Sequence, residues 1–235
     1  MDQINILVTD DEREIADLLE IYLVSDGYRV WKAYSAKEGL QILQEHDIQL
    51  AILDIMMPEM DGIEMCRQIR KFSNIPVIFL SAKSADLDKI LGLGCGADDY
   101  VTKPFSPLEL TARVKSQLRR YTEFNPDGVQ KKDASEVISI RGVVINRTTH
   151  VVTVDGEEIK LTPLEFDILW YLLAQNPGKV FSTDEIFKNV WNETVYEANN
   201  TVMVHIRRLR TKIKDDNRED KIITTVWGVG YKIDQ

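Results

Sequence analysis

Cysteine is scarce in this sequence, which has only Cys66 and Cys95 among its 235 residues. Two cysteines are too few for a disulfide framework, and neither has a second Cys or a His at metal-site spacing. We therefore expect both to be small side chains of the core. Apolar runs are short as well, and none approaches the roughly 20 residues that a membrane-spanning helix needs. The chain is therefore expected to act without a membrane.

Negative charge outweighs positive charge both at the start of the chain and overall. The first residues are acidic and lack the basic segment of a signal peptide, which predicts a cytoplasmic location. The formal net charge of −9 argues against a protein that is basic all over and binds nucleic acid generally. Residues 201–214 are a local exception, because this stretch holds several Lys and Arg and no acid. Such a patch can bind phosphates even in an acidic chain.

The first half of the chain alternates short apolar runs with amphipathic stretches. The runs expected to be strands are residues 4–8, 29–33, 50–53, 77–80 and 100–101. Between the first two, Ile15, Leu18, Leu19 and Tyr22 have helical spacing, and residues 113–120 are expected to close the half as a helix. Strands that alternate with helices predict an α/β fold with a parallel sheet covered on both sides.

A different pattern follows residues 121–136, which are polar, contain Pro and Gly and are predicted to be a linker. In residues 137–235, a β-branched stretch contains the hairpin signal Asp155-Gly156. Capping boxes that begin at Thr162 and Ser182 predict two helix starts, and a third helix is expected after residues 199–200. The chain ends as strand, glycine turn and strand. This order predicts a winged helix-turn-helix domain.

Acidic and polar residues stand where the predicted strands of the first half end. Asp10 and Asp11 follow the first run, Asp54 the third, Ser81 the fourth and Lys103 the fifth. Because ligands of open parallel sheets bind beyond the carboxyl ends of the strands, these groups are expected to converge. Carboxylates of this kind suit Mg²⁺, and Asp54 is a candidate nucleophile toward a phosphoryl group. Any single acid is explained as well by a strand that ends at the surface, but the full set is not.

Four motifs make residues 1–120 resemble the receiver domain of two-component response regulators. They are DDE at 10–12, LDIMMPEMDG at 53–62, SA at 81–82 and GADDYVTKPF at 96–105. The resemblance implies a flavodoxin-like, doubly wound sheet of five parallel strands. It also implies that Asp54 accepts a phosphoryl group from a sensor histidine kinase, and that Mg²⁺ is held by Asp10 or Asp11, by Asp54 and by the backbone carbonyl of Met56.

The same resemblance assigns further roles. Lys103 is expected to contact the phosphoryl group and to precede a cis peptide bond to Pro104. Ser81 and Tyr100 match the switch pair of these domains, although Tyr100 taken alone reads as a half-buried strand tyrosine. One departure is Thr9, which places a hydroxyl where receivers usually have an apolar residue, and it is expected to be tolerated.

The basic stretch 201–214 has two helical faces. Its apolar face carries Val202, Ile206, Leu209 and Ile213. The other face carries Thr201, Val204, His205, Arg208 and Lys212, and is predicted to meet a partner, since a major groove of DNA admits one helix and Arg is its commonest base contact. On charge alone, a solvated basic helix face explains the pattern equally well.

Residues 137–235 resemble the winged-helix effector of the OmpR/PhoB family. The matching motifs are LTPLEFDIL, VW at 190–191, NNTVMVHIRRLRTKI and TVWGVGYKI. The resemblance implies DNA contacts at Thr201, Val204, His205, Arg207, Arg208 and Arg210, and RNA polymerase at the loop that Trp191 opens. Where some members carry a minor-groove Arg in the wing, this chain has Trp227. Within the family, the chain most resembles the VanR regulators of glycopeptide-resistance operons, through DDEREIADLLEIYL, AILDIMMP, SPLELTARVKSQLRRY and TVWGVGYKI.

Opposite charges are expected on one receiver surface, formed by the fourth helix, fifth strand and fifth helix. They are Lys89, Asp98, Asp99, Glu109, Arg113, Lys115 and Arg120. The resemblance implies a homodimer on phosphorylation, with Lys89 paired to Glu109 and Asp99 to Arg120 across it. Ordinary surface charge explains any one pair as well. The tethered pair of DNA-binding domains is expected to bind double-stranded DNA at direct tandem repeats roughly 10–11 base pairs apart.

Three functions stay open at this point. The leading one is a phosphorylation-controlled transcription regulator, which is no enzyme beyond the self-catalysed phosphorylation and dephosphorylation of Asp54. The second is an aspartyl-phosphate phosphatase or transferase, which usually has an acid two residues after the nucleophile, where this chain has Met56. The third is a DNA-binding regulator whose receiver is silent or signals without phosphorylation, against which the complete acidic set argues.

Overall fold

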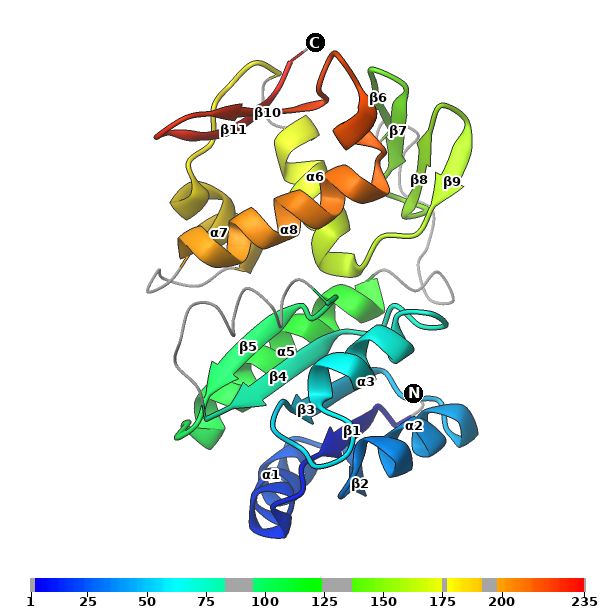
Figure 1. Ribbon diagram of the computed structural model, residues 1–235, viewed down its shortest axis with the longest axis vertical. Coiled ribbons are helices and arrows are strands. Elements are labelled where there is room, and N and C mark those ends of the chain that lie inside the picture. Colours follow the sequence, from blue (N-terminus) through cyan, green and yellow to red (C-terminus); the bar gives the residue numbers. More distant parts are fainter. Residues whose placement is uncertain (1–2, 83–94, 124–136, 175–176, 192–197, 235) are drawn as a thin grey trace. The chain divides into compact units, whose positions relative to one another are not determined.

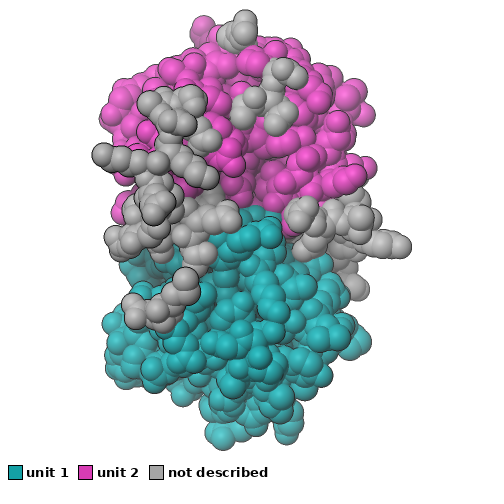
Figure 2. All heavy atoms as spheres, turned by 180° about the vertical axis from the view of Figure 1, so that it is seen from behind, with its two compact units in different colours: residues 1–122 teal, residues 123–235 magenta. Residues whose placement is uncertain are grey.

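The structure, a computed structural model, describes residues 3–82, 95–123, 137–174, 177–191 and 198–234. The chain divides into two compact units, Met1–Thr122 and Glu123–Gln235, and each is described here by itself (Figure 2). In the described part of the chain, no helix is long and apolar enough to cross a membrane.

A five-stranded parallel sheet forms the centre of the N-terminal unit (Figure 1). Its strands are β1 (Asn5–Thr9), β2 (Arg29–Ala33), β3 (Leu50–Asp54), β4 (Val77–Ser81) and β5 (Asp99–Thr102). The order is β2-β1-β3-β4-β5 and every neighbouring pair is parallel, which confirms the predicted flavodoxin-like sheet. The order reverses between β1 and β3, so the carboxyl ends of these two strands mark the place where such sheets bind ligands.

Four described helices belong to this sheet. They are α1 (Arg13–Ser25), α2 (Ala36–Glu45), α3 (Gly62–Ile69) and α5 (Pro107–Glu123). Apolar side chains of α1 and α5 share one core cluster with β1, β3 and β4. The last helix begins at Pro107 rather than at the predicted residue 113, because Leu110 continues the apolar spacing of Val114 and Leu118 and proline suits a first helical turn. This helix also extends to Glu123, into the stretch 121–136 that was predicted to be a linker.

The two cysteines differ in their surroundings. Cys66 lies on α3 and is buried, as predicted, whereas Cys95 is only partly buried. Neither forms a disulfide in the described part of the chain. Hydrogen bonding to Cys95 and burial together raise the pKa of the Cys66 thiol, so this thiol stays protonated and packs as a small apolar group.

The described part of the C-terminal unit contains a four-stranded sheet, three α-helices and a terminal hairpin (Figure 1). The sheet strands are β6 (Val137–Ile140), β7 (Val143–Asn146), β8 (Val151–Val154) and β9 (Glu157–Ile159), all antiparallel. The helices are α6 (Pro163–Ala174), α7 (Thr183–Trp191) and α8 (Ala198–Lys212), and the hairpin pairs β10 (Ile223–Val226) with β11 (Gly230–Ile233). This is the predicted winged helix, although α8 begins three residues earlier than expected.

Local sequence signals explain these elements. Asp155 and Gly156 both have positive φ, 51° and 85°, as a type I′ hairpin turn between β8 and β9 requires. In the predicted capping box of α6, the backbone N–H of Thr162 donates to Glu165 over 2.8 Å and the backbone N–H of Glu165 donates to the Thr162 hydroxyl over 3.4 Å. The box at Ser182 forms in the same way. Both helix starts are therefore confirmed.

Thr9 is buried at the end of β1, and its hydroxyl finds no hydrogen-bond partner among the described residues. A buried unpaired hydroxyl costs about 1–3 kcal/mol, and valine has nearly the same shape without it. We expect Thr9→Val to raise the free energy of unfolding by about 1 kcal/mol, measured by urea denaturation with an unchanged m-value. Gly39→Ala is the contrasting variant, because a Cβ at Gly39 would lie 2.7 Å from the Thr9 hydroxyl, and it should destabilise. A loss of stability in Thr9→Val would mean that the hydroxyl is bonded after all.

Candidate functional site

Three carboxylates meet at the carboxyl ends of β1 and β3. Asp10 and Asp54 are buried and Asp11 is exposed, and one oxygen of each lies within 4.8 Å of the others. Backbone N–H groups fix the two buried ones: Glu12 donates to Asp10 Oδ1 over 3.0 Å and Met56 to Asp54 Oδ2 over 2.8 Å. Three clustered carboxylate oxygens open to water on one side are a donor set that fits a hard divalent cation such as Mg²⁺.

Lys103 brings a positive charge to this cluster from the loop after β5. Its ammonium lies 2.9 Å from Asp10 Oδ2 and 2.9 Å from Asp54 Oδ1. Burial alone would lower the pKa of Lys103, but the two carboxylates raise it above its usual value. Burial raises the pKa of Asp10, against the hydrogen bond from Lys103. The lysine is thus held charged at the mouth of the site, and the predicted cis bond between Lys103 and Pro104 is present.

Glu12 is a site residue that the sequence analysis missed. It precedes α1 and makes no capping hydrogen bond with its side chain. Instead, its carboxylate reaches 3.3 Å from the Lys103 ammonium and stays exposed at the rim. The sequence contained a signal, since Glu12 directly follows Asp10 and Asp11.

Glycine at position 62 allows the chain to close around Asp54. A Cβ at Gly62 would lie 2.1 Å from the Asp54 carbonyl oxygen, so no other residue fits without a backbone shift. The Gly62 N–H donates to the Ile55 carbonyl over 3.1 Å, which brings the start of α3 against the end of β3. Met56 lies between them with 53% of its surface exposed. The DG pair of the LDIMMPEMDG motif therefore shapes the acidic pocket.

The predicted switch residues occupy the ends of β4 and β5. Ser81 is fully buried, and its carbonyl accepts from the Lys103 N–H over 2.6 Å. This bond ties the end of β4 to the loop that carries the lysine. Tyr100 is half-buried and pairs in register with Phe79. The structure therefore brings Asp10, Asp11, Asp54, Ser81 and Lys103 to one edge of the sheet, with Tyr100 on the neighbouring strand.

The charged residues predicted for a dimer surface are largely engaged within the chain. Asp98 is buried, and its Oδ2 accepts from Arg70 over 2.8 Å and from the Val77 N–H over 2.9 Å, so it differs from the predicted surface charge. Asp99 and Glu109 both pair with Arg113, at 3.1 Å and 3.0 Å. Arg120 is also buried, and Lys89 lies outside the described residues.

The helix face predicted to meet a partner is mostly covered, which also differs from the prediction. Val204 and His205 are buried, and the His205 ring lies 5.5 Å from the Trp191 ring, measured between centroids. Arg208 keeps 12% of its side chain exposed and pairs with buried Glu165, with 2.9 Å between Nη2 and Oε1. The physical reason is that α8 packs the His205 ring against Trp191 of α7 and pairs the Arg208 guanidinium with Glu165 of α6. Thr201 is half-buried, and Met203, Arg207 and Thr211 are exposed.

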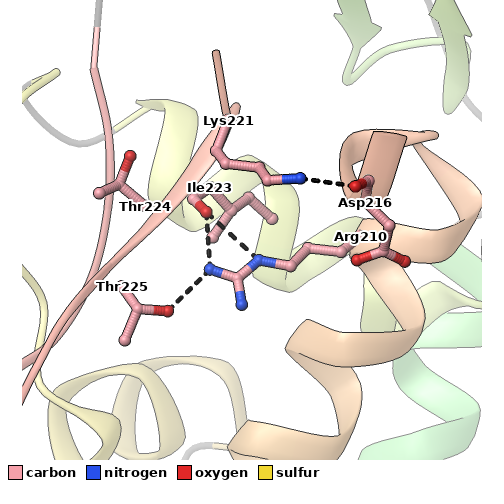
Figure 3. Close-up of a pocket in the computed structure, with 6 residues that line it drawn as sticks. All are labelled: Arg210, Asp216, Lys221, Ile223, Thr224 and Thr225. Carbon is pink, nitrogen blue, oxygen red and sulfur yellow. Dashed lines mark hydrogen bonds between the residues drawn. The ribbon is translucent and has the colours of Figure 1, made fainter. Parts of the chain in front are cut away.

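Arg210 connects α8 to the terminal hairpin. Its Nη2 donates to the Ile223 carbonyl over 2.6 Å and to the Thr225 hydroxyl over 2.8 Å, as Figure 3 shows. These residues line a pocket together with Asp216, Lys221 and Thr224. Both cations of this pocket are engaged within the chain, because the Lys221 ammonium donates to the carbonyls of Asp215 and Asp216 over 2.7 Å each.

A carboxylate beside a lysine at the switch point of a five-stranded parallel sheet, followed by a winged helix, defines the response regulators of two-component systems. Family comparison agrees over both units. Residues 6–115 match the family described as "Response regulator receiver domain", and residues 156–233 match "Transcriptional regulatory protein, C terminal". The chain belongs to the OmpR/PhoB-type response regulators, which bind DNA.

Individual relatives are similar over the full length. The chain is 48% identical to the regulatory protein VanR of Enterococcus faecium and 46% identical to VanRc of Enterococcus gallinarum, with 98% of each chain covered in both cases. Among solved structures, DrrB of Thermotoga maritima, described as an OmpR/PhoB homolog, is 33% identical with a TM-score of 0.52 over 100% of both chains. A mutant of RitR is 25% identical with a TM-score of 0.74 over 99% of both chains.

Proposed function

We propose that Asp54 is the phosphoryl acceptor of this response regulator and that its phosphorylation controls DNA binding by the C-terminal unit. The observation that carries this proposal is the contact of the buried Asp54 carboxylate with Lys103, inside a cluster of carboxylates that fits Mg²⁺. Burying a carboxylate costs free energy, which a nearby positive charge such as the Lys103 ammonium offsets. If the pair of Asp54 and Lys103 served only to stabilise the fold, however, the presence of Asp11 and Glu12 at the rim of the same site would have no explanation.

The chemistry follows from these positions. An Asp54 oxygen attacks the phosphorus of a kinase phosphohistidine, the new O–P bond forms as the P–N bond breaks, and the electron pair of that bond stays on the imidazole. In this proposal, Lys103 pairs with an oxygen of the transferred group, and the Ser81 hydroxyl donates to another. Asp10, Asp11, Asp54 and the Met56 carbonyl would hold Mg²⁺, which when bound supplies positive charge to the phosphoryl oxygens.

Coupling between the units is proposed to run through dimerisation. Asp99, Glu109 and Arg113 form an ion-paired cluster on β5 and α5. Phosphorylation would bias the receiver toward a state that repacks these charges against a second copy. Two tethered winged helices would then gain affinity for tandem repeats. RNA polymerase is the proposed partner near Trp191, and the likeness to VanR supports glycopeptide-resistance genes as targets.

Dimerisation tests this coupling directly. Light scattering of the full-length chain is expected to show a monomer that doubles in mass after treatment with acetyl phosphate and Mg²⁺. Gel shifts on a duplex with two direct half-sites should tighten in parallel. A phosphorylated chain that stays monomeric and binds the duplex no better would remove the dimer mechanism, while leaving the phosphoryl acceptor itself intact.

A DNA-binding regulator whose receiver signals without phosphorylation is the second candidate. The carboxylate cluster argues against it, because a receiver freed from this chemistry has no need to keep Asp10, Asp54 and Lys103 together in a buried site. The two candidates differ in whether acetyl phosphate changes the mass of the chain.

A further inference from the structure

The two cysteines of the chain lie side by side in the N-terminal unit, although 29 positions separate them in the sequence. Cys66 is on α3, and its Sγ lies 4.0 Å from the carbonyl oxygen of Cys95. The Cys66 thiol also forms a hydrogen bond with the side chain of Cys95. The sequence contains no third cysteine. Both thiols of the protein therefore meet at one place, which is the first requirement for an intramolecular disulfide.

The two thiols differ in their access to solvent. Cys95 is partly exposed, whereas Cys66 is buried behind it. A reagent in water therefore meets the Cys95 sulfur first. The Arg70 guanidinium lies beside this position, with its Nε donating to the Gly96 carbonyl over 2.8 Å. A partly exposed cysteine near a positive charge has the surroundings of a reactive thiol, while a buried thiol can react only through its neighbour.

The fold fixes the backbone that carries Cys95. Gly96 has a φ of 122°, and a Cβ there would lie 2.8 Å from Cγ of Arg70, so Arg70 crosses directly over this segment. The same guanidinium donates from Nη2 to Asp98 Oδ2 over 2.8 Å. That oxygen also accepts from the Val77 N–H over 2.9 Å, which connects the segment to β4. Tertiary contacts, rather than a chance encounter of two flexible side chains, therefore bring the thiols together.

We propose that Cys66 and Cys95 are a redox-sensitive dithiol, which hydrogen peroxide converts into an intramolecular disulfide. The Cys95 sulfur attacks one peroxide oxygen, the S–O bond forms as the O–O bond breaks, and the leaving hydroxide takes the thiol proton to become water. The Cys66 sulfur then attacks the Cys95 sulfur of this sulfenic acid. The S–S bond forms as the S–O bond breaks, and a second water leaves with the Cys66 proton. The two thiols thus supply the two electrons that reduce the peroxide.

This pair is separate from the acidic site. Cys95 precedes β5, whereas Lys103 follows the carboxyl end of that strand. Oxidation of the thiols therefore needs neither Asp54 nor Mg²⁺, and it can succeed or fail independently of phosphorylation. The disulfide would connect α3 to the segment that enters β5, and so restrict the movement of one against the other. Thiol reductants reverse such a bond by exchange, which makes the modification reversible.

Peroxide treatment of the full-length chain tests the order of the two steps. Wild type is expected to lose both thiols together, to yield one linked pair of peptides on mapping, and to recover both thiols with dithiothreitol. Cys66→Ser is expected to stop at the Cys95 sulfenic acid, which dimedone traps. Cys95→Ser is the matched control and should keep its Cys66 thiol at the peroxide dose that fully oxidises wild type. Wild type that accumulates the dimedone adduct of Cys95 and keeps the Cys66 thiol would overturn the proposal, as would a disulfide between two chains.

Equilibration with glutathione tests the contact without any substitution. The equilibrium constant for disulfide formation is measured in buffers of reduced and oxidised glutathione, once with folded wild type and once with wild type unfolded in urea. The folded chain is expected to form the disulfide at least about tenfold more favourably, because the fold already holds the two sulfurs together. A smaller ratio would mean that the folded chain keeps the sulfurs too far apart for a bond, and the proposal would then be wrong.

Discussion

Asp54→Asn is expected to abolish phosphorylation of the chain. Wild type incubated with acetyl phosphate and Mg²⁺ should gain the mass of one phosphoryl group, and the variant should gain none, because an amide oxygen is too weak a nucleophile to form the acyl phosphate. Intact-protein mass spectrometry measures both. The variant should also lose the gain in dimerisation and in affinity for tandem sites that acetyl phosphate gives to wild type.

Asp61→Asn is the matched control for this experiment. Asp61 lies a few residues further along the same motif and caps α3, with its Oδ1 accepting from the Glu64 N–H over 2.7 Å. Asparagine caps helices as well as aspartate does, so this variant should fold and become phosphorylated like wild type. An equal mass gain in Asp54→Asn and wild type would place the phosphoryl group on another residue. No gain in either would favour the regulator that signals without phosphorylation.

Much of the acidic site could be predicted from sequence because it depends on strand ends. A buried strand that stops at a charged residue fixes where that residue lies, and parallel strands carry Asp10, Asp54 and Ser81 to one edge whatever the details of packing. Lys103 was predictable for the same reason. Its contact with Glu12 was not, because that contact depends on the rotamers of two long side chains rather than on the position of a strand end.

The surface of α8 was less predictable. Helical spacing identifies two faces, but it does not show which of them neighbouring helices cover. His205 was predicted to contact DNA, but its ring packs near Trp191. Arg208 was predicted to contact a base, but it pairs with Glu165 of another helix. From the sequence, Glu165 was predicted only to belong to a helix cap. In the receiver, Asp98 was similarly assigned to the surface because nothing local indicates that Arg70 binds it.

Glu165 is expected to be the most sensitive position of the C-terminal unit. Its carboxylate is fully buried, accepts from the Thr162 N–H, and forms ion pairs with Arg208 at 2.9 Å and with Lys212 at 2.6 Å. Removing one partner from a buried charge cluster costs about 3–5 kcal/mol, because the remaining charges stay desolvated. We expect Glu165→Ala to lose that much unfolding free energy, measured by urea denaturation of the full chain with tryptophan fluorescence as the probe.

The matched variant is Glu185→Ala, in the second capping box. Glu185 accepts from the Ser182 N–H over 2.8 Å in the same arrangement, but it is exposed, whereas Glu165 is buried among cations. Its replacement should cost no more than about 1 kcal/mol. Equal losses at the two positions would mean that the capping hydrogen bond, and not the buried ion pairs, determines the stability that Glu165 contributes.

The pH dependence of Glu165→Gln separates charge from packing. Burial alone would raise the pKa of Glu165, but Arg208 and Lys212 lower it below the usual value of 4.5. A group whose pKa is lower in the folded state stabilises the fold above its unfolded pKa, and this contribution is lost as the pH falls through the folded pKa. The difference in unfolding free energy between wild type and Glu165→Gln should therefore be largest at pH 7 and should shrink below about pH 4.5. A deficit that stays constant with pH would assign the loss to shape and hydrogen bonding, and the ion pair with Arg208 would then contribute little to stability.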